Sequence, residues 1–271
     1  MLTYLNGISV ATILFYVLVL ILTISLLGRH NPPKAGGWLF LLCFAVLRLI
    51  AAGLQLATIK NPDNPSLPIG FTTVQMIGIA PLEIAALCLL SSVIKSINKA
   101  GGEEGDKRRL PFPPLLTGII IFVGFILGIV GGVKETSEFK NSGVLVTKTE
   151  SKVAIGLFLV CFALIVLGAL TTSIRVSPAK SSEKHLLIAI AVSLPFFLVR
   201  LVYSSIQAFG HDADFGSDTE FLCMAFLMEV AVVLIWEVTG LLGMPEDGFT
   251  VKRFTVRING RLETVEQTCP D

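Results

Sequence analysis

Apolar residues in this chain fall into long runs, without the short alternations of half-buried strands or the narrow stripes of soluble helices. A helix that crosses about 30 Å of hydrocarbon needs about 20 mostly apolar residues. Seven runs reach that length, and we expect each to be a membrane-spanning helix: 8–27, 38–57, 69–94, 115–133, 153–174, 185–208 and 220–242. The pattern predicts an all-α fold, a seven-transmembrane helix bundle.

Composition supports a membrane setting. Of the 271 residues, 53% are hydrophobic and 15% are charged, and the mean hydropathy is +0.79. Soluble domains carry about 25% charged residues, so that class is excluded. The net charge of +1 leaves no basic stripe for phosphates, which argues against nucleic acid as a partner. The expected surroundings are a lipid bilayer.

The connections between the runs predict an orientation. Cytosolic loops carry an excess of Lys and Arg. Fourteen lie in the first, third and fifth connections and the tail, against five in the remaining connections. The N-terminus is therefore expected to be lumenal and the C-terminus cytosolic, with the first run as an uncleaved signal anchor.

Two regions of different composition follow one another along the chain. Residues 1–243 form the predicted transmembrane domain, and residues 244–271 form a cytosolic tail. In the tail, alternating residues 254–258 and 261–265 flank Asn259-Gly260. Asn-Gly accepts the backbone angles of a type I′ turn, so a short C-terminal β-hairpin is predicted.

Five charged residues lie inside the apolar runs. An ionisable group there costs roughly 2.5–3.5 kcal/mol even on a lenient scale, which makes each one a candidate functional residue. Four of them fall in one layer at or lumenal of the midplane once the helices are aligned at 1.5 Å per residue: Arg48, Glu83, Arg200 and Glu229. The fifth, Glu237, lies nearer the cytosolic end and is expected at the interface with water.

The layer predicts a polar cavity. Two acids and two bases at one depth can neutralise each other, which is the condition for burying charge. Tyr203, Ser204 and Gln207 continue the face of Arg200 at helical spacing, and Pro195 frees a carbonyl and bends the same helix. We expect a lumen-facing cavity between the second, third, sixth and seventh runs. The alternative is that the charges serve only to align the helices.

Glycines in the fourth run have the small-xxx-small spacing that brings helices close together. Gly124, Gly128 and Gly132 follow one another at intervals of four residues. We interpret them as a packing face within the bundle.

Motifs for cofactors and metals are missing from the sequence. It contains no P-loop, nucleotide-binding glycine fingerprint, HExxH or GxSxG. The five Cys are single, and four lie in apolar runs. His211 and the neighbouring Asp212, Asp214 and Asp218 are interpreted as a solvated turn, because one His without paired spacing does not make a metal site. No cofactor and no metal are expected.

The predicted cavity suits acid chemistry on an apolar substrate. An apolar environment favours the neutral form of a carboxyl, so an imperfectly paired Glu would keep its proton, while a neighbouring Arg would keep a second Glu ionised. Such an acid could protonate a polyene, and aromatic faces could stabilise the resulting carbocation.

The chain resembles the fungal seven-helix integral membrane proteins, a family that includes membrane-bound terpene cyclases of meroterpenoid pathways of the ascochlorin and ascofuranone type. The resemblance is carried by the seven runs and by Leu47-Arg48-Leu49, Pro81-Leu82-Glu83, Leu198–Tyr203 and Met228-Glu229-Val230. It implies a cofactor-free cyclase for an epoxidised farnesyl phenol. Glu83 or Glu229 would be the catalytic acid, and Arg48, Arg200, Tyr203 and Gln207 would line the cavity as electrostatic or substrate partners. Better-known cyclases of this kind use a Glu and an Asp, whereas no run here has a central Asp.

Two other classes stay open. A seven-helix receptor or sensor would use the same cavity for a ligand, and an uncharacterised structural membrane protein would use the charges only for assembly. Short spans and the lack of a glycosylation acceptor favour the endoplasmic reticulum, whose bilayer is thinner than that of the cell surface.

Overall fold

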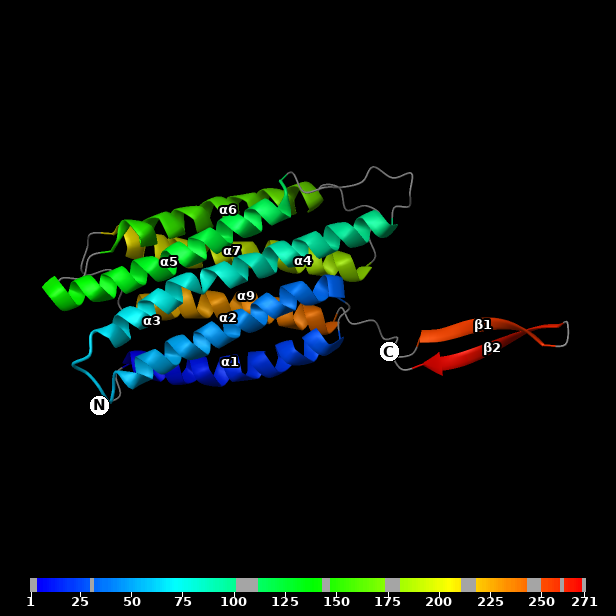
Figure 1. The fold of residues 1–271 in the computed structure, drawn as a ribbon, viewed down its shortest axis with the longest axis horizontal. Coiled ribbons are helices and arrows are strands. Elements are labelled where there is room, and N and C mark those ends of the chain that lie inside the picture. The colour runs from blue at the N-terminus through cyan, green and yellow to red at the C-terminus, as the bar shows by residue number, and fades with distance from the viewer. Residues whose placement is uncertain are drawn as a thin grey trace.

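The structure is a computed structural model that describes residues 4–29, 32–100, 112–142, 147–173, 181–210, 218–242, 250–258 and 261–269. Seven stretches of its helices are long and apolar enough to cross a membrane, as the sequence predicts. They lie side by side in one elongated bundle (Figure 1). The chain is therefore an integral membrane protein with several spans.

Ten helical segments make up the described bundle. They are α1 (Tyr4–Arg29), α2 (Pro32–Ala57), α3 (Ser66–Ile77), α4 (Ile79–Ala100), α5 (Pro114–Ser142), α6 (Thr149–Ser173), α7 (Ser181–Phe209), α8 (Asp218–Glu220), the π-helix η1 (Phe221–Phe226) and α9 (Leu227–Leu242). The last three follow one another without a break and form the seventh span. The fifth helix, α5, continues nine residues beyond the predicted end of its run.

The third span consists of two helices, where the sequence predicts one. α3 ends at Ile77, and α4 begins at Ile79. Pro81 has no N–H for the carbonyl one turn earlier, and the glycine at position 78 lies against another helix. A Cβ at Gly78 would lie 3.1 Å from Cζ of Arg48, so the break brings bare backbone up to a charged side chain of α2.

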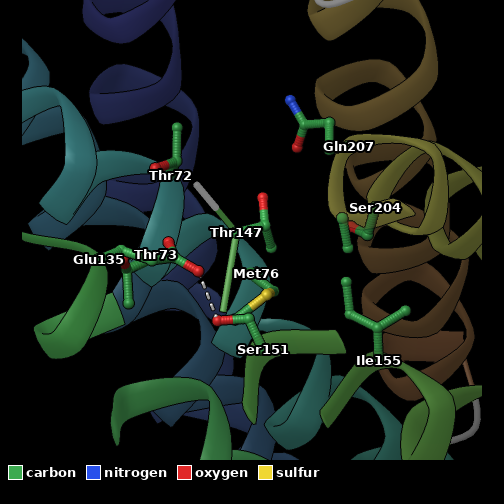
Figure 2. Close-up of a pocket in the computed structure, with 10 residues that line it drawn as sticks. Thr72, Thr73, Met76, Glu135, Thr147, Ser151, Ile155, Ser204 and Gln207 are labelled. Atoms are coloured by element: carbon green, nitrogen blue, oxygen red, sulfur yellow. Dashed lines mark hydrogen bonds between the residues drawn. The ribbon is translucent and has the colours of Figure 1, made fainter. Parts of the chain in front are cut away.

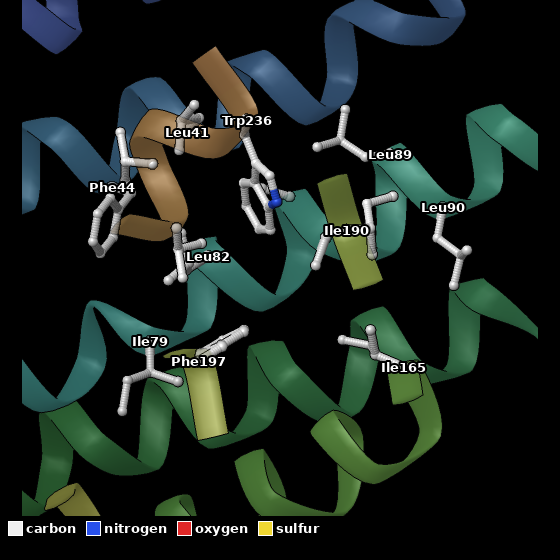
Figure 3. Close-up of a cluster of buried hydrophobic side chains, with 14 of the residues drawn as sticks. Leu41, Phe44, Ile79, Leu82, Leu89, Leu90, Ile165, Ile190, Phe197 and Trp236 are labelled. Atoms are coloured by element: carbon white, nitrogen blue, oxygen red, sulfur yellow. The ribbon is translucent and has the colours of Figure 1, made fainter. Parts of the chain in front are cut away.

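This broken span is the centre of the bundle. In its most apolar stretch 83% of the residues are buried, against 28–44% in the other six spans. α4 packs on α2, α5, α6 and α7. Figure 3 shows the core around it, where Leu82 and Leu89 meet Trp236 and Ile190. The outer helices α1 and α5 instead present apolar side chains such as Leu14 and Leu115 outward, which suits contact with lipid.

Glycines bring α5 against its neighbours, as their spacing predicts. A Cβ at Gly124 would lie 2.8 Å from the Phe158 ring, one at Gly128 2.7 Å from Ile77, and one at Gly132 2.2 Å from Thr73. These contacts lie within the bundle. α5 therefore approaches α3 and α6 more closely than any larger residue would allow.

The tail contains two strands, β1 (Thr250–Ile258) and β2 (Arg261–Cys269). They pair antiparallel, with Phe254 opposite Val265. The predicted turn residues Asn259 and Gly260 lie outside the described residues.

Candidate functional site

Three of the predicted intramembrane charges meet in one cluster. Arg48 of α2 and Arg200 of α7 both donate hydrogen bonds to Oε1 of Glu229 on α9. Their side chains are only 1%, 2% and 3% exposed. The alignment of helix depths from sequence thus brings these three residues together correctly.

Gln75 of α3 is the fourth member of the cluster, and the sequence analysis did not identify it. Its side-chain oxygen accepts from Arg48. Its backbone carbonyl accepts from Nη1 of Arg48 at 3.3 Å and from Nη2 of Arg200 at 2.8 Å. The carbonyl is available because α3 ends two residues later, where the helix no longer supplies a partner. The indirect signal was the combination of Gly78 and Pro81 in an apolar run.

Aromatic rings border the cluster. Cζ of Arg48 lies 4.8 Å from the Phe44 ring centroid, and Cζ of Arg200 lies 5.8 Å from that of Tyr203, both within the range of cation–π attraction. Tyr16 of α1 packs edge-on against Phe44 at 5.7 Å.

The cluster contains two cationic side chains and one anionic side chain. Ser204 accepts a hydrogen bond from Nη1 of Arg200, whereas Nε of Arg48 has no hydrogen-bond partner among the described residues. Neutral acceptors such as Ser204 and Gln75 do not cancel the second positive charge. A buried pair is strongly destabilised when one partner is removed. Glu229 therefore ties α2 and α7 to α9 through its two arginine partners.

Glu83 lies outside this cluster. The side chain is 0% exposed, and neither carboxyl oxygen has a hydrogen-bond partner among the described residues. The pairing with Arg48 or Arg200 that the common depth suggests is not found in that part of the chain. Depth alone does not determine which way a side chain points, and α4 directs Glu83 into apolar surroundings.

A pocket of about 210 Å³ lies beside the charge cluster. Ser204 connects the two, because it lines the pocket and also accepts from Arg200. Gln207 lines the pocket as well, as the polar stripe on α7 predicts. Figure 2 shows these two residues facing Thr72, Thr73 and Glu135 across the pocket.

The walls of the pocket differ from the prediction. They come from α3, α5, α6 and α7 together with Thr147, which precedes α6, whereas the sequence indicated the second, third, sixth and seventh spans. α2 and α9 instead contribute Arg48 and Glu229 to the ion cluster, and neither helix supplies a lining residue of the pocket. Tyr203 is not among the lining residues. Its ring lies 6.4 Å from Phe221, and its hydroxyl accepts from Nε2 of Gln207 at 2.8 Å.

Glu135 is a pocket residue that the sequence analysis missed. It lies just beyond the apolar run of the fourth span, which ends at residue 133 in the sequence analysis. In the structure α5 extends past it, and its Oε1 accepts from the Ser151 hydroxyl at 2.8 Å and from the Lys148 backbone N–H at 3.0 Å. The neighbouring ion pairs Lys134–Glu150 and Lys148–Glu138 join the ends of α5 and α6.

Glu237 is buried, and the expectation that it lies at the interface is wrong. It is 1% exposed and accepts a hydrogen bond from the Thr23 hydroxyl of α1. Glu237 is buried because it lies on a face of α9 that packs against other helices. Three residues later, a Cβ at Gly240 would lie 2.4 Å from the Trp38 ring of α2 and 3.2 Å from Leu26 of α1, so this face packs against other helices.

The described residues contain no group of three or more His, Cys, Asp or Glu side chains suited to a metal ion. Of the acidic turn in the sequence, only Asp218 is described, at the start of α8. His211, Asp212 and Asp214 lie outside the described residues.

A sequence-family model described as "Domain of unknown function (DUF7702)" matches residues 2–244. The match covers the whole helical bundle and ends at the tail. No curated protein matches the sequence.

Proposed function

The chain belongs to the DUF7702 family, whose description names no activity, and from the chemistry of its buried carboxyls we propose that it is a membrane-bound terpene cyclase. The reaction is the acid-initiated cyclisation of an epoxidised prenyl phenol, a step of meroterpenoid biosynthesis that needs no cofactor. The observation that carries the proposal is the isolated carboxyl of Glu83. The family description neither favours nor opposes this assignment.

Glu83 has the properties of a proton donor. Neither of its oxygens has a hydrogen-bond partner among the described residues, and the side chain is fully buried on the central helix. An ionised carboxylate in such surroundings would carry a large desolvation cost without compensation. This buried, unpaired position favours the neutral carboxyl, and we assign Glu83 as the donor of a proton to the epoxide oxygen.

Glu229 suits a different role. Two guanidinium groups donate to the same oxygen of Glu229, so this carboxyl is engaged in two ion pairs and is not a free acid. Of the two carboxyls suggested by the sequence, Glu83 is thus assigned as the acid and Glu229 as the residue that positions Arg48 and Arg200. Opposite environments for two carboxyls are the usual way in which acid and stabiliser roles are separated.

Aromatic rings belong to the apolar core of α4, which a substrate would have to open because Glu83 does not line the described pocket. Phe158, Phe162 and Phe197 belong to the same apolar cluster as Leu82, the neighbour of Glu83. Phe162 and Phe197 meet edge-on at 5.3 Å. Aromatic faces stabilise a cation without offering a nucleophile that would trap it.

The test is incubation of microsomes that contain the full chain with epoxidised farnesyl phenol. We expect a product of unchanged mass and new retention time, because the proton given to the epoxide oxygen is balanced by the proton that the final carbocation loses, which restores the acid. Glu83→Gln, which keeps the shape but cannot donate the acid proton, should lower the rate by about 10²–10⁴-fold, the usual contribution of a general acid. The product is identified by chromatography and mass spectrometry.

Glu237→Gln is the matched control, because Glu237 is also a buried glutamate but bonds to Thr23 at another place in the bundle. It should retain the activity. Folded protein that forms no isomer from several prenyl epoxides would refute the cyclase. Equal losses in Glu83→Gln and Glu237→Gln would refute the role of Glu83.

A receptor or sensor is the second candidate, and the link between pocket and ion cluster favours it. A ligand that moves Ser204 would disturb its bond with Arg200 and, through Glu229, the contacts of α2 and α9. Allosteric coupling requires such an element shared by two regions. The same incubation separates the two candidates, because a receptor leaves the epoxide unchanged.

The orientation and the organelle are also part of the proposal. The excess of Lys and Arg in alternate connections supports a lumenal N-terminus and a cytosolic tail. The organelle we propose is the endoplasmic reticulum, and the described spans, of 22–30 residues, are long enough to cross its bilayer.

A further inference from the structure

The pocket between α3, α5, α6 and α7 presents mainly hydrogen-bond acceptors. Five hydroxyl groups line it, from Thr72, Thr73, Thr147, Ser151 and Ser204. Each hydroxyl has a single proton to donate. Thr72 and Thr73 donate theirs to the Ile69 carbonyl at 2.9 and 2.8 Å, and Ser151 donates to Glu135. Three hydroxyl oxygens are therefore left to accept hydrogen bonds from a ligand.

The amide of Gln207 adds another acceptor at the mouth. One of its N–H groups donates to Tyr203 at 2.8 Å, and its carbonyl oxygen remains available. Figure 2 shows this oxygen directed toward Thr147, while the amide nitrogen points away. Thr147, Ser204 and the second N–H of Gln207 can still donate, but acceptors outnumber donors in the lining, which favours a ligand with donors of its own.

Glu135 gives the pocket a negative charge. Its carboxylate is held by two hydrogen-bond donors, the Ser151 hydroxyl and the Lys148 N–H, neither of which is a cation. The neighbouring acids Glu138 and Glu150 each form an ion pair with a lysine, whereas Glu135 forms none with the described residues. A cationic donor on the Glu135 side of the pocket, across from Ser204 and its partner Arg200, would form an ion pair with this carboxylate.

Size and apolar lining indicate an organic cation, because the pocket is too large for a bare ion. The 210 Å³ of the pocket corresponds to about seven water molecules at their share of the liquid volume. Met76, Ile155 and Ala208 form its apolar wall. Carbon atoms of a ligand can pack there while its charged end reaches Glu135.

We propose that this pocket binds a primary alkylammonium group, with Glu135 as its counter-ion and Thr72, Thr73 and Gln207 as hydrogen-bond acceptors. The proposal does not depend on the cyclase activity. It assigns a ligand class to the pocket whether the chain is an enzyme or a receptor.

The experiment measures binding of n-butylammonium to the full chain in lipid nanodiscs, by calorimetry and by the shift of the unfolding temperature at constant ionic strength. We expect saturable binding. Butyltrimethylammonium, which has the charge but no N–H, and 1-butanol, which lacks the charge, should each bind at least about tenfold more weakly, because charge-assisted hydrogen bonds are stronger than neutral ones.

Two variants test the lining residues. Glu135→Gln keeps an acceptor for Ser151 and Lys148, so the local fold is retained while the charge is lost, and n-butylammonium should bind at least about tenfold more weakly. Thr73→Val keeps the shape and removes one acceptor oxygen, and it should weaken binding by a smaller factor. Asp63→Asn is the control, because Asp63 is an exposed acid in the loop before α3 and does not line the pocket.

Three results would overturn the proposal. One is n-butylammonium binding that does not saturate or that is unchanged in Glu135→Gln. Another is equal affinity for butyltrimethylammonium. The third is a Glu135-dependent shift produced by sodium or potassium chloride alone, which would identify an inorganic ion as the occupant.

Discussion

Arg48 and Arg200 share one carboxylate oxygen, so the buried cluster has one more positive charge than negative. This imbalance determines how much stability is lost when each side chain is removed. Removal of one arginine leaves a neutral ion pair, whereas removal of Glu229 leaves two unneutralised guanidinium groups in an apolar interior.

We therefore predict that Glu229→Gln destabilises the protein more than Arg200→Gln does. The expected loss for Glu229→Gln is about 3–5 kcal/mol, the usual cost of breaking a buried ion pair. Thermal unfolding of the purified variants in one detergent measures the order. The double variant Glu229→Gln/Arg200→Gln should recover part of the loss. A larger loss for Arg200→Gln than for Glu229→Gln would contradict the charge count.

At this scale the sequence predicted part of the site. It identified Arg48, Arg200 and Glu229, because ions in apolar runs are conspicuous and their depth follows from residue number. It did not predict the isolation of Glu83 or the burial of Glu237, because depth does not say which helix a side chain faces. It missed Glu135 because that residue lies past the end of an apolar run.

Among the helices, α5 depends most visibly on residue size. Its glycines Gly124, Gly128, Gly131 and Gly132 all lie against side chains of other helices, whereas a Cβ at Gly118 of the same helix would meet nothing within 4 Å. One helix thus supplies both a test position and its control.

Gly132→Ala should destabilise the bundle, because the added Cβ would lie 2.2 Å from Thr73 and force α5 away from α3. Overpacking of this kind costs about 1–3 kcal/mol. Gly118→Ala should instead be neutral or stabilising by up to about 1 kcal/mol, since alanine has the better helix propensity. Unfolding temperatures of the two variants provide the comparison, and equal shifts would argue against close packing at Gly132.

The elements themselves were largely predictable. The thickness of a bilayer imposes a minimum length on every span, so hydropathy alone located all seven. The break at Gly78 was not predictable with the same rule, because membrane helices often contain Gly and Pro without interruption. What makes it a break here is a guanidinium group of α2 lying against the backbone, a contact that no local pattern encodes.

For the whole molecule, the orientation of the bundle in the membrane is predicted from the charges of its connections. Lys and Arg in the connections predict that the loop between α2 and α3 is lumenal and that the start of α7 is cytosolic. Asp63 and Lys184 are exposed at these two places.

A cysteine-free chain with Asp63→Cys or Lys184→Cys tests this prediction in sealed microsomes. A membrane-impermeant maleimide should label Lys184→Cys at once and Asp63→Cys only after the vesicles are opened. The reversed pattern would invert the topology and place the pocket on the cytosolic side.

The ion cluster also has a consequence for the biosynthesis of the protein. Arg48 and its carboxylate partner Glu229 are 181 residues apart, which is roughly 9–36 s of translation at 5–20 residues per second. Until the final helix is made, the second helix carries a buried cation without its counter-ion. Any ribosome pause or truncation before the final span therefore leaves six helices with uncompensated charge, a substrate for membrane quality control, and the last helix synthesised is the one that completes the assembly.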